Sequence, residues 1–161
     1  AVGGKICYPD NTIQNAGTFF GTNNEFLQGS AFYKISKNQI GYMGRLCYSQ
    51  NVSAVSGAFM MMKKDIFQNL SGMDEHFVGA YGDTDLCLRI RKTGKLIVWT
   101  PFAEIYHYEV NGVSSESGNS VARRNFKNDF SLFKNRWESV LEKGDPYYNP
   151  NFSGEDYNFT Y

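Results

Sequence analysis

Two aspartates, Asp83 and Asp85, lie two positions apart where a glycine-containing loop meets an expected helix. A carboxylate at such a junction is well held, and if it is partly desolvated beside a second carboxylate it can gain the raised pKa of a general base. The same two residues can instead serve as helix-dipole partners and caps. The residue types alone leave both interpretations open.

His107 is one of two histidines, and it follows an apolar segment. A histidine can bind a metal ion, or it can simply pack and form hydrogen bonds. If the strand expected at residues 95–100 returns beside the helix that begins at Asp83, then Asp83, Asp85 and His107 gather at one sheet edge. Open α/β sheets place their ligands at the carboxyl ends of strands, so this edge is a candidate site.

The elements that position these residues can be read from hydrophobic spacing. We expect a helix over residues 83–93, with Gly94 just past its end and an Asp85/Arg89 pair one turn apart. The apolar run at residues 95–100 predicts a strand that Pro101 stops, followed by a second short extended piece up to His107.

The first 70 residues are less regular. Residues 3–8 predict a short strand, and residues 17–51 predict irregular loops with short strands. The continuous run of apolar and small residues at 52–62 predicts a strand buried on both faces, with its methionines in the core. A short helix from residue 64 to 70 should follow.

A long amphipathic helix is indicated after a polar linker at residues 111–120, because apolar side chains recur every three or four positions: Phe126, Phe130, Phe133, Trp137 and Leu141. Gly144 should end it. We therefore divide the chain into residues 1–120, which carry the candidate site, and residues 121–161, a helix and an aromatic tail that pack on it.

Composition excludes several classes of function. Sixteen basic residues balance sixteen acidic ones among 161, so no positive field would attract nucleic acid. No apolar run approaches the roughly 20 residues that a transmembrane helix needs. The three cysteines share no metal-type spacing and fit reduced thiols. We expect a cytoplasmic location, which for the full-length enzyme includes a peripheral position at the inner membrane face.

Several short motifs occur in an order that resembles family 2 glycosyltransferases. They are Ser56-Gly57-Ala58-Phe59-Met60, Gly72-Met73-Asp74-Glu75-His76-Phe77, Gly82-Asp83-Thr84-Asp85-Leu86-Cys87-Leu88-Arg89, Gly94, and Ala103-Glu104-Ile105-Tyr106-His107. The resemblance covers about residues 2–152 and extends to rhamnosyltransferase-like enzymes of bacterial polysaccharide synthesis. Each motif alone is weak, whereas the ordered set is specific.

The resemblance implies the C-terminal half of a GT-A fold: an α/β domain with a mixed sheet, flanking helices and the long C-terminal helix. It also implies transfer of a sugar, with inversion, from a nucleoside diphosphate to a hydroxyl of a saccharide or lipid-linked acceptor. In that reaction Asp83 matches the family's general base. Asp85 matches a carboxylate that orients the site or the helix.

The remaining site residues also follow from the resemblance. Asp74 and Glu75 match an element that shapes the acceptor side, and Ser56-Gly57 would let donor or acceptor approach the backbone closely. His107 lies where the family can supply a ligand to Mn²⁺ or Mg²⁺, and a mixed carboxylate and imidazole shell favours Mn²⁺.

The sequence also departs from the family pattern. No D-x-D motif precedes these elements, so we expect this chain alone to bind a nucleotide-sugar donor poorly and to be inactive without a nucleotide-binding half. Gly82 replaces the glutamate that usually precedes the base. An alternative function is a carbohydrate-binding or scaffolding module that uses its many Tyr and Phe rings without catalysis.

Overall fold

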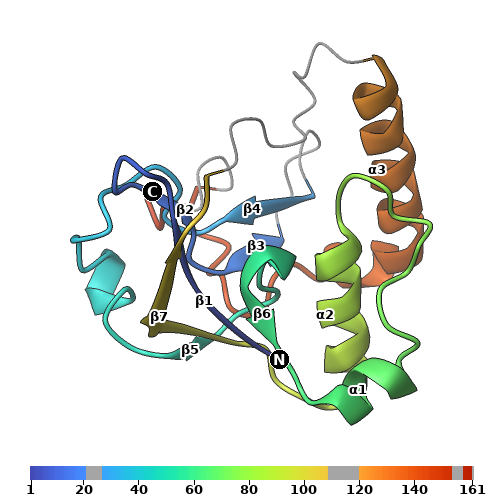
Figure 1. The fold of residues 1–161 in the computed structure, drawn as a ribbon, viewed down its shortest axis with the longest axis horizontal. Helices are drawn as coiled ribbons and strands as arrows, with labels where there is room; N and C mark the ends of the chain where they lie inside the picture. Colours follow the sequence, from blue (N-terminus) through green and yellow to red (C-terminus); the bar gives the residue numbers. More distant parts are fainter. Residues whose placement is uncertain (21–26, 109–119, 154–157, 161) are drawn as a thin grey trace.

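The computed structural model describes residues 1–20, 27–108, 120–153 and 158–160, which form a mixed α/β fold (Figure 1). The strand β1, Val2–Cys7, lies at the centre of a five-stranded mixed sheet. It runs parallel to β7, Val98–Tyr106, and it pairs antiparallel with β2, Ile13–Asn15, and with β6, Met60–Met61. The short strand β5, Gln50–Asn51, pairs antiparallel with β7. The strand predicted near residues 3–8 is thus confirmed as β1.

A second, two-stranded sheet pairs β3, Thr18–Phe20, with β4, Gln28–Ser30. A single 3₁₀ turn, η1, follows at Tyr42–Gly44. Only short strands and turns therefore occupy the described part of residues 17–51, as their composition predicts.

The strand β7 corrects the prediction that Pro101 stops a strand at residue 100. Its pairing with β1 passes from Gly4–Thr100 directly to Lys5–Glu104, so three residues of β7 lie outside the ladder. Proline has no N–H to donate and is tolerated in a strand where a bulge leaves it unpaired. Figure 1 shows β7 bending sharply, and the two predicted extended pieces are one bent strand.

The predicted strand over residues 52–62 is also wrong. Residues 52–55 are buried, but they have no continuous ladder, and the chain then forms a 3₁₀ turn, η2, at Gly57–Phe59. The Phe59 N–H donates to the Ser56 carbonyl, and the Gly57 N–H donates to a side chain far along the sequence. Because local and tertiary partners take the N–H groups of Gly57 and Phe59, the turn η2 stands where the strand was predicted, and only β6 follows it.

The three predicted helices are confirmed as α1, Lys64–Asn69, α2, Gly82–Lys92, and α3, Ser120–Leu141. Gly94 has φ +77°, the left-handed conformation expected just past the end of α2. The helix α3 ends at Leu141, three residues before Gly144. Of the linker predicted at residues 111–120, Ser120 belongs to α3 and the other residues lie outside the described part of the chain.

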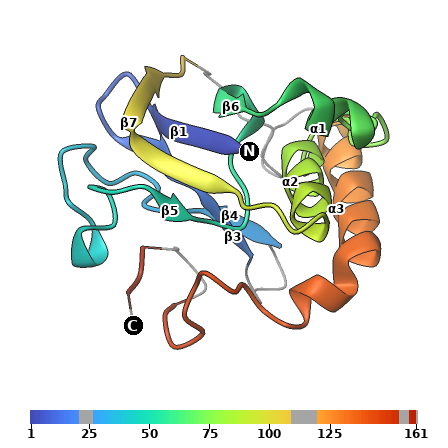
Figure 2. The ribbon, with the colours of Figure 1, turned by 90° about the horizontal axis from the view of Figure 1, so that it is seen from below.

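The helices gather on one side of the strands, with α2 between α3 and the sheet (Figures 1 and 2). One hydrophobic cluster joins the sheet, the inner side of α2 and the aromatic tail, where Trp99 and Ile90 are fully buried. A second cluster joins α2 to α3 through Leu88, Phe133 and Trp137. The helix α2 is therefore packed on two sides.

Candidate functional site

Asp83 lies in the first turn of α2 with its carboxylate fixed by two backbone N–H groups. Oδ1 accepts a hydrogen bond from the Thr84 N–H at 2.8 Å, and Oδ2 accepts one from the Gly57 N–H at 2.8 Å. The residue is half-buried and lines an open pocket of about 380 Å³. A general base must be held within hydrogen-bonding reach of the proton that it removes, and this geometry provides such a fixed carboxylate.

Ser56 and Gly57 form the turn that faces Asp83. The Ser56 Oγ accepts a hydrogen bond from the Ala58 N–H at 3.3 Å, and this contact begins η2. A Cβ atom added to Gly57 would lie 3.2 Å from the Asp83 Cβ, closer than ordinary contact. The absence of a side chain at Gly57 thus lets the Asp83 side chain lie close to the backbone of the turn. Contact of either residue with a substrate stays a prediction.

The loop over residues 77–82 forms much of the pocket wall beside Asp83. The N–H groups of Val78, Gly79 and Ala80 all donate to the carboxylate of Asp129, at 3.3, 2.7 and 2.8 Å. Asp129 belongs to α3 and is 1% exposed. The wall of the pocket therefore takes its shape from a buried carboxylate on the C-terminal helix.

Tyr81 precedes α2 in an unusual conformation. Its φ is +65°, in the left-handed region that costs an L-residue roughly 1–2 kcal/mol. Its buried ring stacks on Phe133 with centroids 4.8 Å apart. Burial raises the pKa of its hydroxyl to about 12. The packing of Tyr81 on α3 holds the backbone turn that directs Asp83 into the pocket.

Asp74 and Glu75 lie on the loop between α1 and α2. Asp74 Oδ1 accepts a hydrogen bond from the His76 N–H at 3.0 Å and lies 2.7 Å from His76 Nδ1, while Oδ2 accepts one from Arg136 Nη1 at 2.7 Å. The hydrogen bonds from His76, followed by that from Arg136, lower the pKa of Asp74 well below its usual range. Glu75 is exposed and lines a separate pocket of about 440 Å³.

Asp85 is fully buried and contacts both α2 and α3. Its carboxylate accepts hydrogen bonds from Arg89 Nε at 2.7 Å, Arg136 Nη1 at 3.0 Å and Trp137 Nε1 at 2.9 Å. A buried carboxylate needs such a full set of donors to offset the loss of water. Asp85 thus ties α2 to α3. The orienting role that the resemblance implies for it, and its contact with substrate, stay predictions.

His107 follows the last residue of β7, at the carboxyl end of that strand. Its N–H donates to the Cys7 carbonyl at 2.9 Å, and its Nδ1 lies 2.9 Å from Gln14 Oε1. Its position beside the end of β1 matches the strand-end placement expected from the sequence. Within the described residues, no hydrogen bond or ion pair joins His107 to Asp83 or Asp85.

Metal binding by His107 also stays a prediction. In the part of the chain that the structure describes, no three His, Cys, Asp or Glu side chains gather closely enough to hold a metal ion. A divalent cation there would need ligands from a bound diphosphate or from other parts of the protein.

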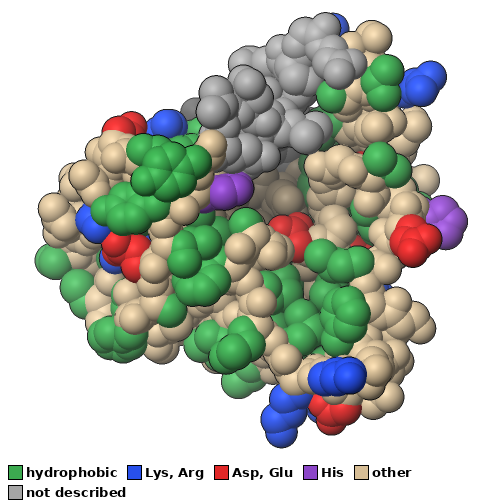
Figure 3. All heavy atoms as spheres, in the orientation of Figure 1, with side chains coloured by type: hydrophobic (Ala, Val, Ile, Leu, Met, Phe, Trp, Pro, Cys, Tyr) green, Lys and Arg blue, Asp and Glu red, His purple; other side chains and the backbone are tan. Residues whose placement is uncertain are grey.

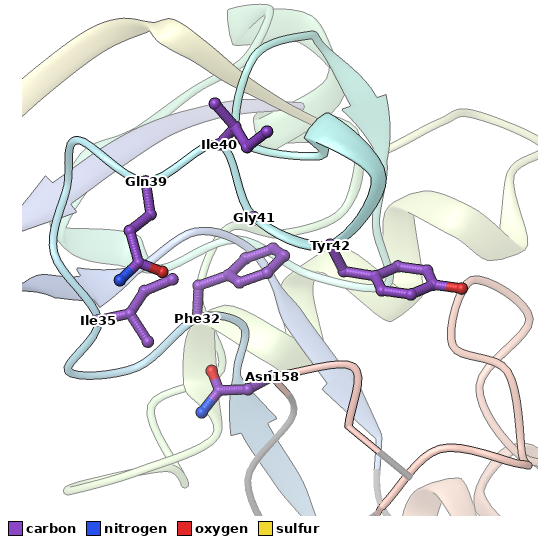
Figure 4. A pocket seen from close by; sticks show the side chains of 7 residues that line it. All are labelled: Phe32, Ile35, Gln39, Ile40, Gly41, Tyr42 and Asn158. Carbon is purple, nitrogen blue, oxygen red and sulfur yellow. The ribbon is translucent and has the colours of Figure 1, made fainter.

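Another pocket, of about 530 Å³, shares no lining residue with the pocket at Asp83 (Figure 4). Its walls are Phe32, Ile35, residues 39–42 and Asn158 from the C-terminal tail. The lining contains no carboxylate and no imidazole. This pocket therefore offers no group for acid–base chemistry.

Two residues that support the site were not predicted as site residues from the sequence. Asp129 holds the loop over residues 78–80, and Arg136 connects Asp74 to Asp85. Asp129 could have been found, because it follows Phe126 by three positions and precedes Phe133 by four, on the apolar face of the helix. A charged residue there needs a buried partner.

Comparison with curated proteins finds relatives much longer than this chain. An uncharacterized protein, y4gI, of Sinorhizobium fredii is 37% identical over 160 residues, which are 99% of this chain and 17% of that protein. The O-antigen biosynthesis protein RfbC of Myxococcus xanthus is 27% identical over 154 residues, 95% of this chain and 12% of that protein. The N-acetylglucosaminyl-diphospho-decaprenol L-rhamnosyltransferase of Mycobacterium tuberculosis is 28% identical over 71 residues, 44% of this chain and 23% of that protein.

The chain is similar to glycosyltransferase-related proteins. It spans less than a fifth of the length of the two relatives that match nearly all of it. No family model matches the chain, and no solved structure matches it significantly. Among the described residues, no helix combines the length and apolar character that crossing a membrane requires.

Proposed function

We propose that this chain is the acceptor side of an inverting glycosyltransferase with a GT-A fold, active in cell-surface polysaccharide synthesis. The names of the Myxococcus and Mycobacterium relatives support this class of reaction. The observation that carries the proposal is the fixed carboxylate of Asp83, held by the Gly57 and Thr84 N–H groups at the wall of an open pocket.

In the proposed reaction the acceptor hydroxyl lies in this pocket against Asp83. A free oxygen lone pair of the Asp83 carboxylate accepts the hydroxyl proton while the acceptor oxygen bonds to the anomeric carbon of the donor sugar. The bond from that carbon to the nucleoside diphosphate breaks, and the diphosphate leaves with the electron pair. Attack opposite the leaving group inverts the configuration at the anomeric carbon.

The other predicted residues have supporting roles in this proposal. Asp85, with Arg136 and Trp137, holds the first turn of α2 in place, and Asp74 holds Arg136 from the other side. Glu75 and Ser56 are proposed to contact the acceptor. His107 is proposed as one ligand of Mn²⁺ or Mg²⁺, an ion that would neutralise the leaving diphosphate; the described residues alone do not complete that ligand set.

The test is to replace Asp83 by Asn in the protein at its native length and to measure sugar transfer. Asparagine keeps the shape of the side chain but cannot accept the proton, so kcat should fall by about 10²- to 10⁴-fold, the usual contribution of a general base. Asp65→Asn is a matched control, because Asp65 is an exposed acid in the first turn of α1. Transfer by Asp83→Asn near the parent rate would disprove the assignment of the base.

A further inference from the structure

A methionine-rich groove lies next to the candidate site. It has a volume of about 410 Å³ and is lined by Met60, Met61, Met62, Phe67, Met73 and Leu86. Gly57 and Lys64 complete its lining. Met61 is 72% exposed and Phe67 is 40% exposed, so large apolar side chains here face solvent. Figure 3 shows hydrophobic side chains on this face of the molecule, around β6 and α1.

The groove adjoins the pocket at Asp83, because Gly57 and Met73 line both. A molecule with its hydroxyl at Asp83 can therefore extend past these two residues onto the methionines. Four of the five methionines of the chain line the groove, and the fifth, Met43, lies in η1. Methionine side chains are flexible and polarizable, which suits a surface that adapts to a bound alkyl chain.

One lysine, Lys64, gives the groove a positive charge, and Lys63 is its neighbour in the sequence. Lys64 lines it, Lys63 precedes α1, and both are exposed. Neither lysine forms an ion pair with another described residue. The exposed carboxylate nearby in sequence, Asp65, is not among the lining residues and accepts the Ile66 N–H at 2.9 Å. An apolar floor with a cationic side chain at its wall is complementary to an anionic amphiphile.

We propose that the groove holds the apolar chain of the acceptor, an amphiphile whose phosphate group is bound by Lys64. The proposal rests on the proposed function, since it takes Asp83 as the position of the acceptor hydroxyl. The enzyme would then select its acceptor through the lipid as well as through the sugar. Each buried CH₂ contributes at most about 0.8 kcal/mol, so a short alkyl chain already gives measurable affinity.

The experiment observes the methionine methyl groups directly. The chain is labelled with ¹³C-methyl methionine and titrated with octyl phosphate below its micelle concentration, while methyl NMR signals are followed. The signals of Met60, Met61, Met62 and Met73 should shift together and saturate, whereas Met43 stays unchanged and serves as an internal control. Shifts that are absent, or that include Met43 equally, would overturn the proposal.

Two further titrations separate the parts of the ligand. Octyl glucoside, which has no charge, should bind more weakly than octyl phosphate, and inorganic phosphate alone should not shift the methionine signals. Vesicles that contain an anionic lipid test a different occupant. If the methionines respond to vesicles but not to monomeric octyl phosphate, the groove contacts a membrane surface and the proposal fails.

Matched variants test the two sides of the groove. Met61→Gln should weaken octyl phosphate binding about threefold or more by removing apolar contact, while Met43→Gln, at a residue 79% exposed, should not change it. Lys64→Glu should also weaken binding about threefold or more, whereas Lys95→Glu, an exposed lysine beyond α2, should not. Equal effects of a test variant and its control would contradict the assignment.

Binding in the groove and catalysis by Asp83 can fail separately. If Asp83→Asn keeps full transfer activity while the methionine signals still respond to octyl phosphate, the base is wrong and the groove stands. If Asp83→Asn abolishes transfer but octyl phosphate leaves the methionines unaffected, the base stands and the groove is not the acceptor site.

Discussion

The N–H of Gly57 donates a hydrogen bond to Oδ2 of Asp83 at 2.8 Å, and these two residues come from segments 26 positions apart. The two residues also lie close together: a Cβ atom added to Gly57 would lie only 3.2 Å from the Asp83 Cβ. The turn at residues 56–59 thus both restrains the candidate base and limits where its side chain can lie. Neither effect depends on a substrate.

Gly57→Ala should reduce sugar transfer without unfolding the protein. The added methyl group would push the Asp83 side chain by a few tenths of an ångström, and misplacement of a catalytic group by about 1 Å can cost about 10²-fold. We expect kcat to fall about three- to tenfold. Gly57 is exposed and its φ is not positive, so the thermal midpoint should change little. Ala58→Gly, in the same exposed turn, is the control, and an equal loss of rate in both variants would argue against steric displacement of Asp83.

Asp85→Asn should disturb Trp137 and leave Trp99 unaffected. The indole N–H of Trp137 donates to Asp85 Oδ1 at 2.9 Å, whereas that of Trp99 donates to the Gly4 carbonyl at 3.1 Å. The amide also weakens the ion pairs with Arg89 and Arg136, so the free energy of unfolding should fall by about 2–4 kcal/mol. The two indole signals in a ¹H–¹⁵N spectrum give the measurement. A shift of the Trp99 signal alone would contradict the contact between α2 and α3.

The sequence predicted the helices well because their evidence is local. Apolar residues three and four positions apart indicated α3, and the glycine after α2 marked its end. Strand boundaries were predicted less well. A bulge lets β7 continue through Pro101. Just before β6, the N–H groups of Gly57 and Phe59 donate to Asp83 and Ser56 instead of to a neighbouring strand. Hydrogen-bond partners that lie far apart along the chain cannot be predicted from the local sequence.

The candidate site shows the same division. Asp83 and Asp85 lie two positions apart and are the same residue type, yet one lines a pocket and the other is fully buried. Their motif could not separate these environments, because Arg136 and Trp137 lie about 50 residues away. The sequence predicts both as site residues, and only the tertiary structure separates the carboxylate that lines the pocket from the one that is fully buried.

Asp74 should make stability depend on acid. Its pKa is lowered in the folded protein by hydrogen bonds from His76 and Arg136, so the stabilisation is present above the usual aspartate pKa, roughly 4, and is lost as the pH falls through the lower folded value. Asp74→Asn removes this pH-dependent stabilisation of the folded state. Thermal midpoints of parent and variant, measured from pH 6 downward, should therefore differ most above about pH 4 and converge in stronger acid. Parallel curves over the whole range would show that these hydrogen bonds do not favour the ionised form.

Asp129→Asn should loosen the wall of the Asp83 pocket. The carboxylate accepts three backbone N–H groups from residues 78–80 in a buried position, and an asparagine offers one oxygen and turns an NH₂ group toward donors. Leaving such donors unpaired costs about 1–3 kcal/mol, so the free energy of unfolding, measured by denaturant titration, should fall by about that amount. Because the loop lines the pocket, transfer should fall more than global stability explains, with faster hydrogen exchange at Val78, Gly79 and Ala80. Ser131→Ala, an exposed position two residues further along α3, is the control. If Asp129→Asn lowers stability while the exchange of these three amides and the transfer rate of the folded fraction stay unchanged, Asp129 serves the fold alone and does not position the site.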